Sequence, residues 1–167
     1  TFSGVLAQSS GDVSVGTGGV LNLLNTGASN VTGGTLSNIG TIQVQGGTLN
    51  VNAGFPTNNG TLDIGAGATV LTNGNPLTNE GILRGNGTLD LGGKTLLNNK
   101  TVAPGTSPGT LMINGGYTQG PTGVLSIDLG GTTQGANHDL LQITGNAMLD
   151  GTLRVQYIGG YTPAPAD

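Results

Sequence analysis

The sequence has no cysteine and no tryptophan, and only 7% of its 167 residues are charged. Without cysteine there is no disulfide framework, and a single histidine without cysteine excludes a zinc site of the usual type. No apolar run reaches the roughly 18 residues that a membrane span needs, and no signal peptide is recognisable, which is expected of a mature form or an excised piece. Nucleic acid is excluded as a partner because four basic residues are too few to follow a phosphate backbone; they are Arg84, Lys94, Lys100 and Arg154.

Glycine is the residue that the chain has in excess, with 34 copies. The glycines have no three-residue period, which excludes collagen. A disordered chain is also excluded, because the net charge is only −4 and Val, Ile and Leu recur at regular intervals. We therefore expect one folded domain with a sizeable core.

A short motif, Gly-Thr-Leu or Gly-Thr-Ile, recurs along the chain and opens segments that alternate in polarity. In the segment 60–64, Leu62 and Ile64 share one face, predicted to point inward, while Thr61 and Asp63 point to water. The same alternation places Gln43, Asn50, Asp90 and Arg154 in solvent. The seven copies begin at Gly34, Gly40, Gly47, Gly60, Gly87, Gly109 and Gly151.

A longer period is superimposed on this alternation. Four segments align on a leading asparagine, at Asn38, Asn58, Asn79 and Asn98, with spacings of 20, 21 and 19 residues. Helical repeats are longer, at about 33 residues or more. Further columns with a spacing of 20 are Gly47, Gly67 and Gly87, then Pro56 and Pro76, then Thr57, Leu77 and Leu97.

These patterns predict an all-β fold, a parallel β-helix (β-solenoid) with rungs of about 20 residues and an irregular C-terminal part. Each strand would bond to its equivalents on the rungs above and below, around a narrow core of Leu, Ile and Val. Gly and Asn would occupy the corners because they tolerate positive φ. The four asparagines would form an internal ladder in which each side-chain amide bonds the next.

The chain divides into three parts by this reading. Residues 1–33 are predicted to be an irregular N-terminal lead-in or cap, and the segment 26–34 at its end is predicted to be a loop. Residues 34–103 carry the regular rungs, and 104–167 form a C-terminal continuation or cap of the solenoid. Strand-like segments outside the regular part are 11–15, 20–24, 124–129, 139–143 and 147–158.

The residues that could carry chemistry favour a structural interpretation. His138 and Asp139 lack the nucleophile elbow of a Ser/His/Asp site, so we expect a loop histidine beside a capping aspartate. Asp63 and Asp90 are 27 residues apart, which does not suit adjacent rungs and argues against a carboxylate pair of the glycosidase type.

Metal and ice binding are also disfavoured. The eight acidic residues are spread too widely for a calcium site. An outward threonine array of the ice-binding kind is interrupted by Ile82, which aligns with Thr61 and Thr101. The sequence therefore predicts no catalytic, cofactor-binding or metal-binding residue, and no cofactor.

The last part of the chain carries a recognisable pattern. APGTSPGTLMINGGYTQ is followed by GVLSIDLGG, by DLLQITGNAMLDGTL and by GGYTP. Over residues 103–167 this order is similar to the C-terminal part of autotransporter passenger domains and related bacterial β-strand-repeat surface proteins. In that family the matching positions are turn-formers; they are Pro104, Gly105, Pro108, Gly109, Asp139, Gly145 and Gly151.

The resemblance implies a right-handed parallel β-helix, export, display on the bacterial surface or outside the cell, and roles in adhesion, aggregation or as a stalk. It implies no catalytic residue. The family normally continues beyond this segment, often into an outer-membrane barrel, so the chain is expected to be part of a longer protein.

Three functions remain open from the sequence. The leading hypothesis is a non-enzymatic extracellular or cell-surface module, structural or adhesive, that presents a rigid rod. The alternative is a self-assembling extracellular fibre subunit, joined by end-to-end stacking or β-strand addition. The third is a polysaccharide-active enzyme, because some β-helices are enzymes. Expected partners are further copies of the chain, or glycans and proteins of host or other surfaces.

Overall fold

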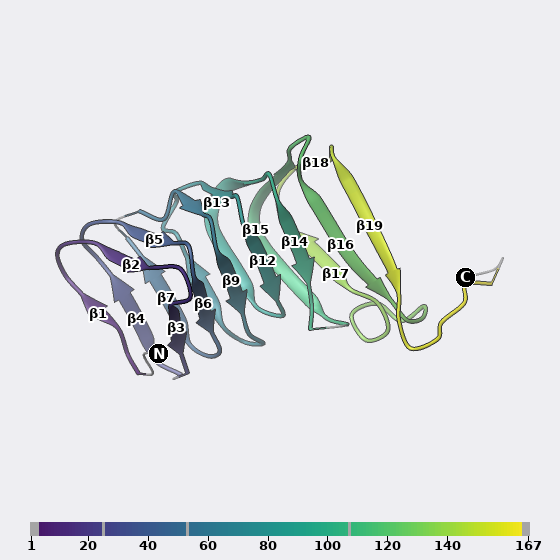
Figure 1. Cartoon of the computed structure of the whole chain (residues 1–167), viewed down its shortest axis with the longest axis horizontal. Helices are drawn as coiled ribbons and strands as arrows, with labels where there is room; N and C mark the ends of the chain where they lie inside the picture. Colours follow the sequence, from purple (N-terminus) through teal and green to yellow (C-terminus); the bar gives the residue numbers. More distant parts are fainter. Residues whose placement is uncertain (1–3, 25, 53, 107, 165–167) are drawn as a thin grey trace.

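The computed structural model describes residues 4–24, 26–52, 54–106 and 108–164. Within these ranges the chain contains strands and turns and no helix. The strands stack in parallel along one axis in about six turns, which confirms the predicted β-solenoid (Figure 1). Residues 1–3, 25, 53, 107 and 165–167, which belong to all three predicted parts of the chain, lie outside the described residues.

Each turn, or rung, contributes strands to three columns. The first column contains strands that each pair with the equivalent strand of the next rung. Its members are β2 (Val13–Val15), β5 (Leu36–Asn38), β8 (Thr57–Asn58), β11 (Leu77–Asn79), the second half of β13 (Thr88–Asn98), the second half of β15 (Thr110–Gln119) and β18 (Ala147–Met148).

The second column is a separate seven-stranded sheet. Its members are β3 (Val20–Leu23), β6 (Thr41–Val44), β9 (Thr61–Ile64), β12 (Ile82–Gly85), β14 (Thr101–Pro104), β16 (Val124–Leu129) and β19 (Thr152–Tyr157). The third column is made of β1 (Ala7–Gln8), β4 (Ala28–Val31), β7 (Thr48–Val51), β10 (Thr69–Leu71), the first halves of β13 and β15, and β17 (Leu140–Ile143).

The first and third columns join into one sheet because β13 and β15 run through the corner between them. In β13 the chain turns at Gly92 and Gly93, which have φ values of 57° and 81°. A side chain with a Cβ rarely adopts such values, so these two positions require glycine.

The vertical register follows the asparagine period. Leu62 pairs with Leu83, and Asn58 pairs with both Asn38 and Asn79. The stricter 20-residue columns are wrong by one residue, because the rungs vary in length. Thr48 pairs with Thr69, which places Ala68 and not Gly67 above Gly47, and Thr57 pairs with Thr78 and not with Leu77.

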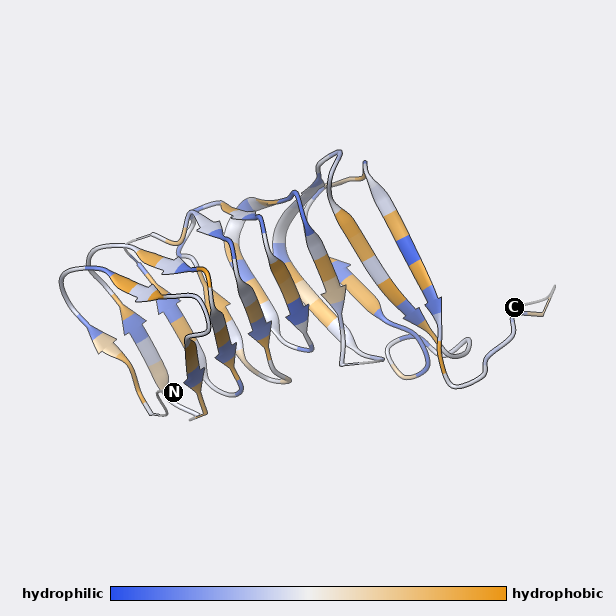
Figure 2. Cartoon of the chain, viewed as in Figure 1, coloured by the Kyte–Doolittle hydropathy of each residue, from blue (hydrophilic) through white to orange (hydrophobic). Residues whose placement is uncertain are grey.

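Inward side chains from all three columns form one continuous core. Figure 2 shows the alternation of apolar and polar positions along the strands of the second column. Leu62, Ile64 and Leu83 are representative, with at most 1% of their surface exposed. Burial of such side chains contributes about 1.5–3 kcal/mol each.

The predicted asparagine ladder is present at the corner between the first and second columns. The Nδ2 groups of Asn38, Asn58 and Asn79 donate to the Oδ1 atoms of Asn58, Asn79 and Asn98 at 2.7, 2.8 and 2.9 Å. The ladder then changes residue type: Asn98 donates to the Tyr117 hydroxyl, which donates to Gln119 Oε1. All of these side chains are buried.

Positive φ accounts for many of the corner glycines, as expected, but not for the corner asparagines. Among the described residues other than glycine, Asn73 alone has a positive φ, at 52°. At the corner after the asparagines, glycine is needed for close approach: a Cβ on Gly81 would lie 2.0 Å from the backbone oxygen of Gly60. The backbone at Gly60 is therefore too close to position 81 for a Cβ at that position.

The N-terminal loop prediction was also wrong in part. Residues Ala28–Val31 form β4, because this small polar segment pairs along its whole length with Thr48–Val51. Beyond Pro104 the strands continue the same columns with longer rungs: Val102 pairs with Leu125, and Leu125 pairs with Leu153. The predicted strand at 147–158 is divided into β18 and β19.

Candidate functional site

Two enlarged loops lie at the same corner of the solenoid, on consecutive rungs. One follows β14, with residues 105–106 and 108–109 described, and the other follows β16 and covers 130–139. The equivalent turn on an earlier rung, after β6, has three residues, 45–47. Insertions at a corner leave the stacked strands undisturbed, so this corner is where the rod can carry a binding feature.

Asp139 ties the two loops to the sheet. Its Oδ1 accepts the backbone N–H of Gly109 at 2.9 Å, and its Oδ2 accepts that of Asp128 at 2.9 Å. Only 6% of Asp139 is exposed. This burial raises the pKa of the Asp139 carboxyl, while the two backbone N–H groups act in the opposite direction.

Beside these loops the outer surface of the second column is hollowed, with a cavity volume of about 400 Å³. Its lining comes from four successive rungs. The charged members are Asp63 on β9, Arg84 on β12, Asp128 on β16 and Asp139; the others are Ala103, Pro104, Gly105, Thr106 and Ser126. We call these nine residues the corner hollow.

An ion pair forms one wall of the corner hollow. Arg84 donates through Nε and Nη2 to the same oxygen of Asp63, Oδ2, at 3.0 Å in each case. Asp63 is 8% exposed, so the prediction that it points freely into water was wrong. Its neighbour on the next rung covers it, because Arg84 and Asp63 are paired in register.

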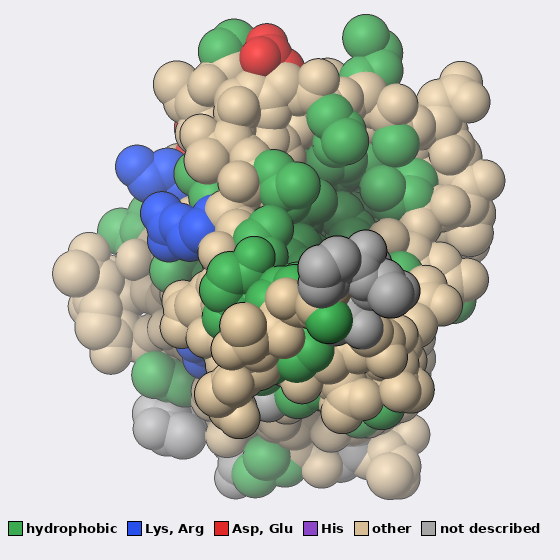
Figure 3. Space-filling view, turned by 90° about the vertical axis from the view of Figure 1, so that its right-hand side faces the viewer, with side chains coloured by type: hydrophobic (Ala, Val, Ile, Leu, Met, Phe, Trp, Pro, Cys, Tyr) green, Lys and Arg blue, Asp and Glu red, His purple; other side chains and the backbone are tan. Residues whose placement is uncertain are grey.

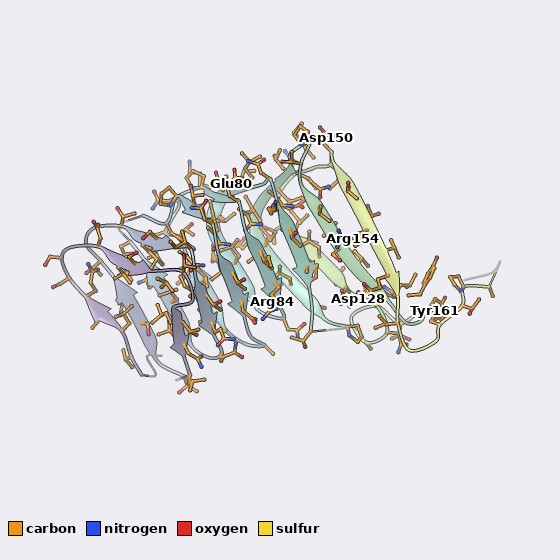
Figure 4. The ribbon with its side chains drawn as sticks, in the orientation of Figure 1. Glu80, Arg84, Asp128, Asp150, Arg154 and Tyr161 are labelled. Atoms are coloured by element: carbon orange, nitrogen blue, oxygen red, sulfur yellow. The ribbon has the colours of Figure 1, made fainter. Side chains whose placement is uncertain are left out.

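Figure 4 shows how the labelled charged residues lie on this side of the rod. Arg84 and Asp128 lie along the same edge of the second column, on β12 and β16 with β14 between them, and Arg154 lies on β19. Arg154 is not part of the hollow's lining. The sequence contains one signal for this site, an acid and a base in equivalent rung positions 21 residues apart.

The other residues considered for chemistry lie apart from one another. His138 is on the 130–139 loop, where its Nδ1 is 3.1 Å from the backbone oxygen of Gly131. Asp90 is on the third column and accepts the N–H of Gly92, so the structure does not bring it to Asp63. Ile82 stands between Thr61 and Thr101 in the second column, as expected.

Two features are absent from the described residues. No three His, Cys, Asp or Glu side chains gather closely enough there to hold a metal ion. In the same part of the chain there is no helix of the length and hydropathy needed to cross a membrane.

A second surface feature is the C-terminal end of the stack. The inward positions of the last rung hold apolar side chains that are 46–69% exposed, whereas Val15, Leu21 and Leu23 on the first rungs are at most 7% exposed. Figure 3 looks onto this end and shows hydrophobic side chains gathered at its centre. The exposed residues are Leu149, Leu153, Val155 and Tyr157.

Comparison with known proteins gives one informative similarity. An autotransporter adhesin of Brucella suis biovar 1 (strain 1330), named Adhesin BmaC autotransporter, is 38% identical over 73 residues. These residues are 42% of this chain and 2% of the adhesin, so the chain spans only a small fraction of that relative's length. No protein-family model matches the chain, and no solved structure matches it. The similarity confirms the resemblance to autotransporter surface proteins.

Proposed function

We propose that the chain is a rigid, non-enzymatic module of an exported bacterial surface protein, which holds adhesive features away from the cell. The observation that carries the proposal is the uninterrupted parallel stacking of rungs. The buried side-chain ladder from Asn38 to Gln119 holds these rungs in register. The partial similarity to an autotransporter adhesin supports the same role and an extracellular location.

The mechanism is geometric. Strands in the interior of the stack are paired on both sides, so the backbone offers a protease few unpaired segments. Adjacent rungs are separated by about 4.8 Å, so each further turn lengthens the rod by that amount. The loops at one corner, with described residues 105–106, 108–109 and 130–139, leave the stacking of the strands undisturbed.

The test is an adhesion assay with the purified chain. Microbeads coated with the chain should be retained on cultured cells or on immobilised surface glycoproteins under flow, and beads coated with albumin should not. Antibodies raised against the chain should label intact cells of the bacterium that produces it. A chain that releases reducing ends from a polysaccharide panel, or that is found only after cell lysis, would contradict the proposal.

The fibre hypothesis also has a supporting observation, the exposed apolar C-terminal end with β19 at the edge of its sheet. Uncovered apolar strands at a sheet edge favour pairing with another chain. Under that hypothesis, filaments whose length increases with protein concentration should be visible in electron micrographs. Val155→Asp should abolish them, whereas Leu97→Asp, on the outer surface in mid-stack, should not.

A further inference from the structure

The corner hollow owes its depth to small side chains between larger ones. In the second column the outward positions of successive rungs are Asp63, Arg84, Ala103 and Ser126, followed by Arg154. With rungs about 4.8 Å apart, Arg84 and Ser126 stand roughly 10 Å apart across Ala103. Pro104, Gly105 and Thr106 bound the gap on the loop side.

Charge is concentrated at this hollow. The chain has twelve charged residues, four basic and eight acidic, and four of them line the hollow. In a chain that is 7% charged, nine lining residues would on average include fewer than one. Two of these four residues, Asp63 and Asp139, are more than nine-tenths buried.

Polar groups of the hollow have hydrogen-bonding capacity left over. The ion pair uses one carboxylate oxygen of Asp63, and within the described part of the chain its Oδ1 has no hydrogen-bond partner. The same holds for Nη1 of Arg84 and for the hydroxyl of Ser126. A carboxylate oxygen accepts, a guanidinium donates, and a serine hydroxyl does both.

These groups select a class of ligand by exclusion. Three acidic residues against one basic residue repel anions, so a phosphate, a sulfate or an acidic sugar is unsuitable. A cation is disfavoured because Asp63 is already paired with Arg84 and Asp139 already accepts two backbone N–H groups. A helical peptide would need an apolar groove. The apolar side chains that line this hollow are Ala103 and Pro104, which are too few to form one.

We propose that the corner hollow binds an uncharged saccharide through its hydroxyl groups. Each hydroxyl of a sugar both donates and accepts, which matches a lining that presents an acceptor at Asp63, a donor at Arg84 and both at Ser126. The Thr106 hydroxyl accepts from Asn86 Nδ2 and keeps its own proton for donation. The proposal rests on the adhesive role proposed above and names the ligand class of that role.

The blocking variant is Ala103→Gln. Gln43 occupies the equivalent outward position on an earlier rung, so the fold accepts glutamine in this column, and at position 103 its side chain fills the gap between Arg84 and Ser126. Ala28→Gln is the matched control, because Ala28 is an exposed strand residue of the third column. A second variant, Ser126→Ala, removes one hydroxyl and leaves the shape of the hollow nearly unchanged.

The probes are uncharged tetrasaccharides at millimolar concentration, namely cellotetraose, maltotetraose, mannotetraose and N-acetylchitotetraose, with binding followed by ligand-observed NMR. We expect at least one of them to bind, with affinity reduced at least tenfold by Ala103→Gln, about fivefold by Ser126→Ala and not at all by Ala28→Gln. Thermal unfolding of each variant establishes that it is folded.

The inference is overturned if none of the four binds, if Ala103→Gln leaves binding unchanged, or if calcium or heparin fragments bind in the hollow instead. The bead assay separates this from the proposed function. If beads coated with Ala103→Gln adhere as well as beads coated with the wild-type chain, the adhesive role is supported and the saccharide site is contradicted. If a saccharide binds in solution but the coated beads do not adhere, the saccharide site is supported and the adhesive role is contradicted.

Discussion

Asn58 donates its side-chain amide to Oδ1 of Asn79 on the next rung, at 2.8 Å, and both residues are fully buried. The same Nδ2 group also contacts the backbone oxygens of Gly60 and Ile82. An apolar contact tolerates sliding between rungs, but this amide is satisfied only when each rung stands in register over the next. The ladder therefore specifies alignment as well as stability.

Replacing Asn58 by Ala should destabilise the fold by about 2–4 kcal/mol, because Oδ1 of Asn79 loses its donor and a cavity is left in the corner. The measurement is urea unfolding followed by circular dichroism. Asn59→Ala is the control, since Asn59 is exposed and takes part only through its backbone; its effect should stay within about 0.5 kcal/mol. Equal effects of the two variants would mean that the ladder contributes no stability.

Tyr117→Phe should cost about 1–2 kcal/mol, because the Tyr117 hydroxyl donates to Gln119 Oε1 and accepts from Asn98. Burial also raises the pKa of the Tyr117 phenol, which keeps its proton in place for this donation. Tyr157→Phe, at a side chain that is 60% exposed, should be nearly neutral in the same unfolding experiment. If Tyr117→Phe is as stable as the wild type, the hydrogen bonds of the Tyr117 hydroxyl to Asn98 and Gln119 do not stabilise the C-terminal rungs.

Gly81→Ala should destabilise the solenoid by about 2–3 kcal/mol, because the new Cβ would lie 2.0 Å from the backbone oxygen of Gly60 and the rungs would have to separate. Gly16→Ala is the matched control, as nothing lies within 4 Å of its added Cβ. Thermal unfolding of both variants tests this directly. If Gly81→Ala is as stable as Gly16→Ala, adjacent rungs can move apart at this corner with little cost in the free energy of unfolding.

Asp139→Asn tests the balance at the loop anchor. The pKa of Asp139 is raised in the folded chain, so the folded state keeps a proton that the unfolded state releases. The contribution of this group to stability is therefore full below the unfolded pKa of about 3.9 and declines as pH rises through the folded pKa.

The difference in unfolding free energy between wild type and Asp139→Asn should accordingly become smaller from pH 3 to pH 7. Urea unfolding at four or five pH values measures it. A difference that grows with pH would mean that the N–H groups of Gly109 and Asp128 stabilise the carboxylate more than burial opposes it.

The candidate site was only partly accessible from sequence. Asp63 and Arg84 occupy equivalent rung positions, so their pairing follows once the rung length is known to be 21 residues at that point. The contribution of Asp139 does not follow in this way. Its bond to Gly109 spans 30 residues and joins two irregular loops whose course has no period.

Alternation and the asparagine spacing by themselves determined that this chain is a parallel β-solenoid, and they placed Asn38, Asn58, Asn79 and Asn98 in one column. Local pattern suffices there because every rung repeats the same contacts with its neighbours. Only the tertiary structure decided that Ala28–Val31 is a strand, that Gly81 is required by close approach, and that a hollow opens beside Ala103. Those features depend on which residue of the next rung lies opposite, and a change of one residue in rung length alters that pairing.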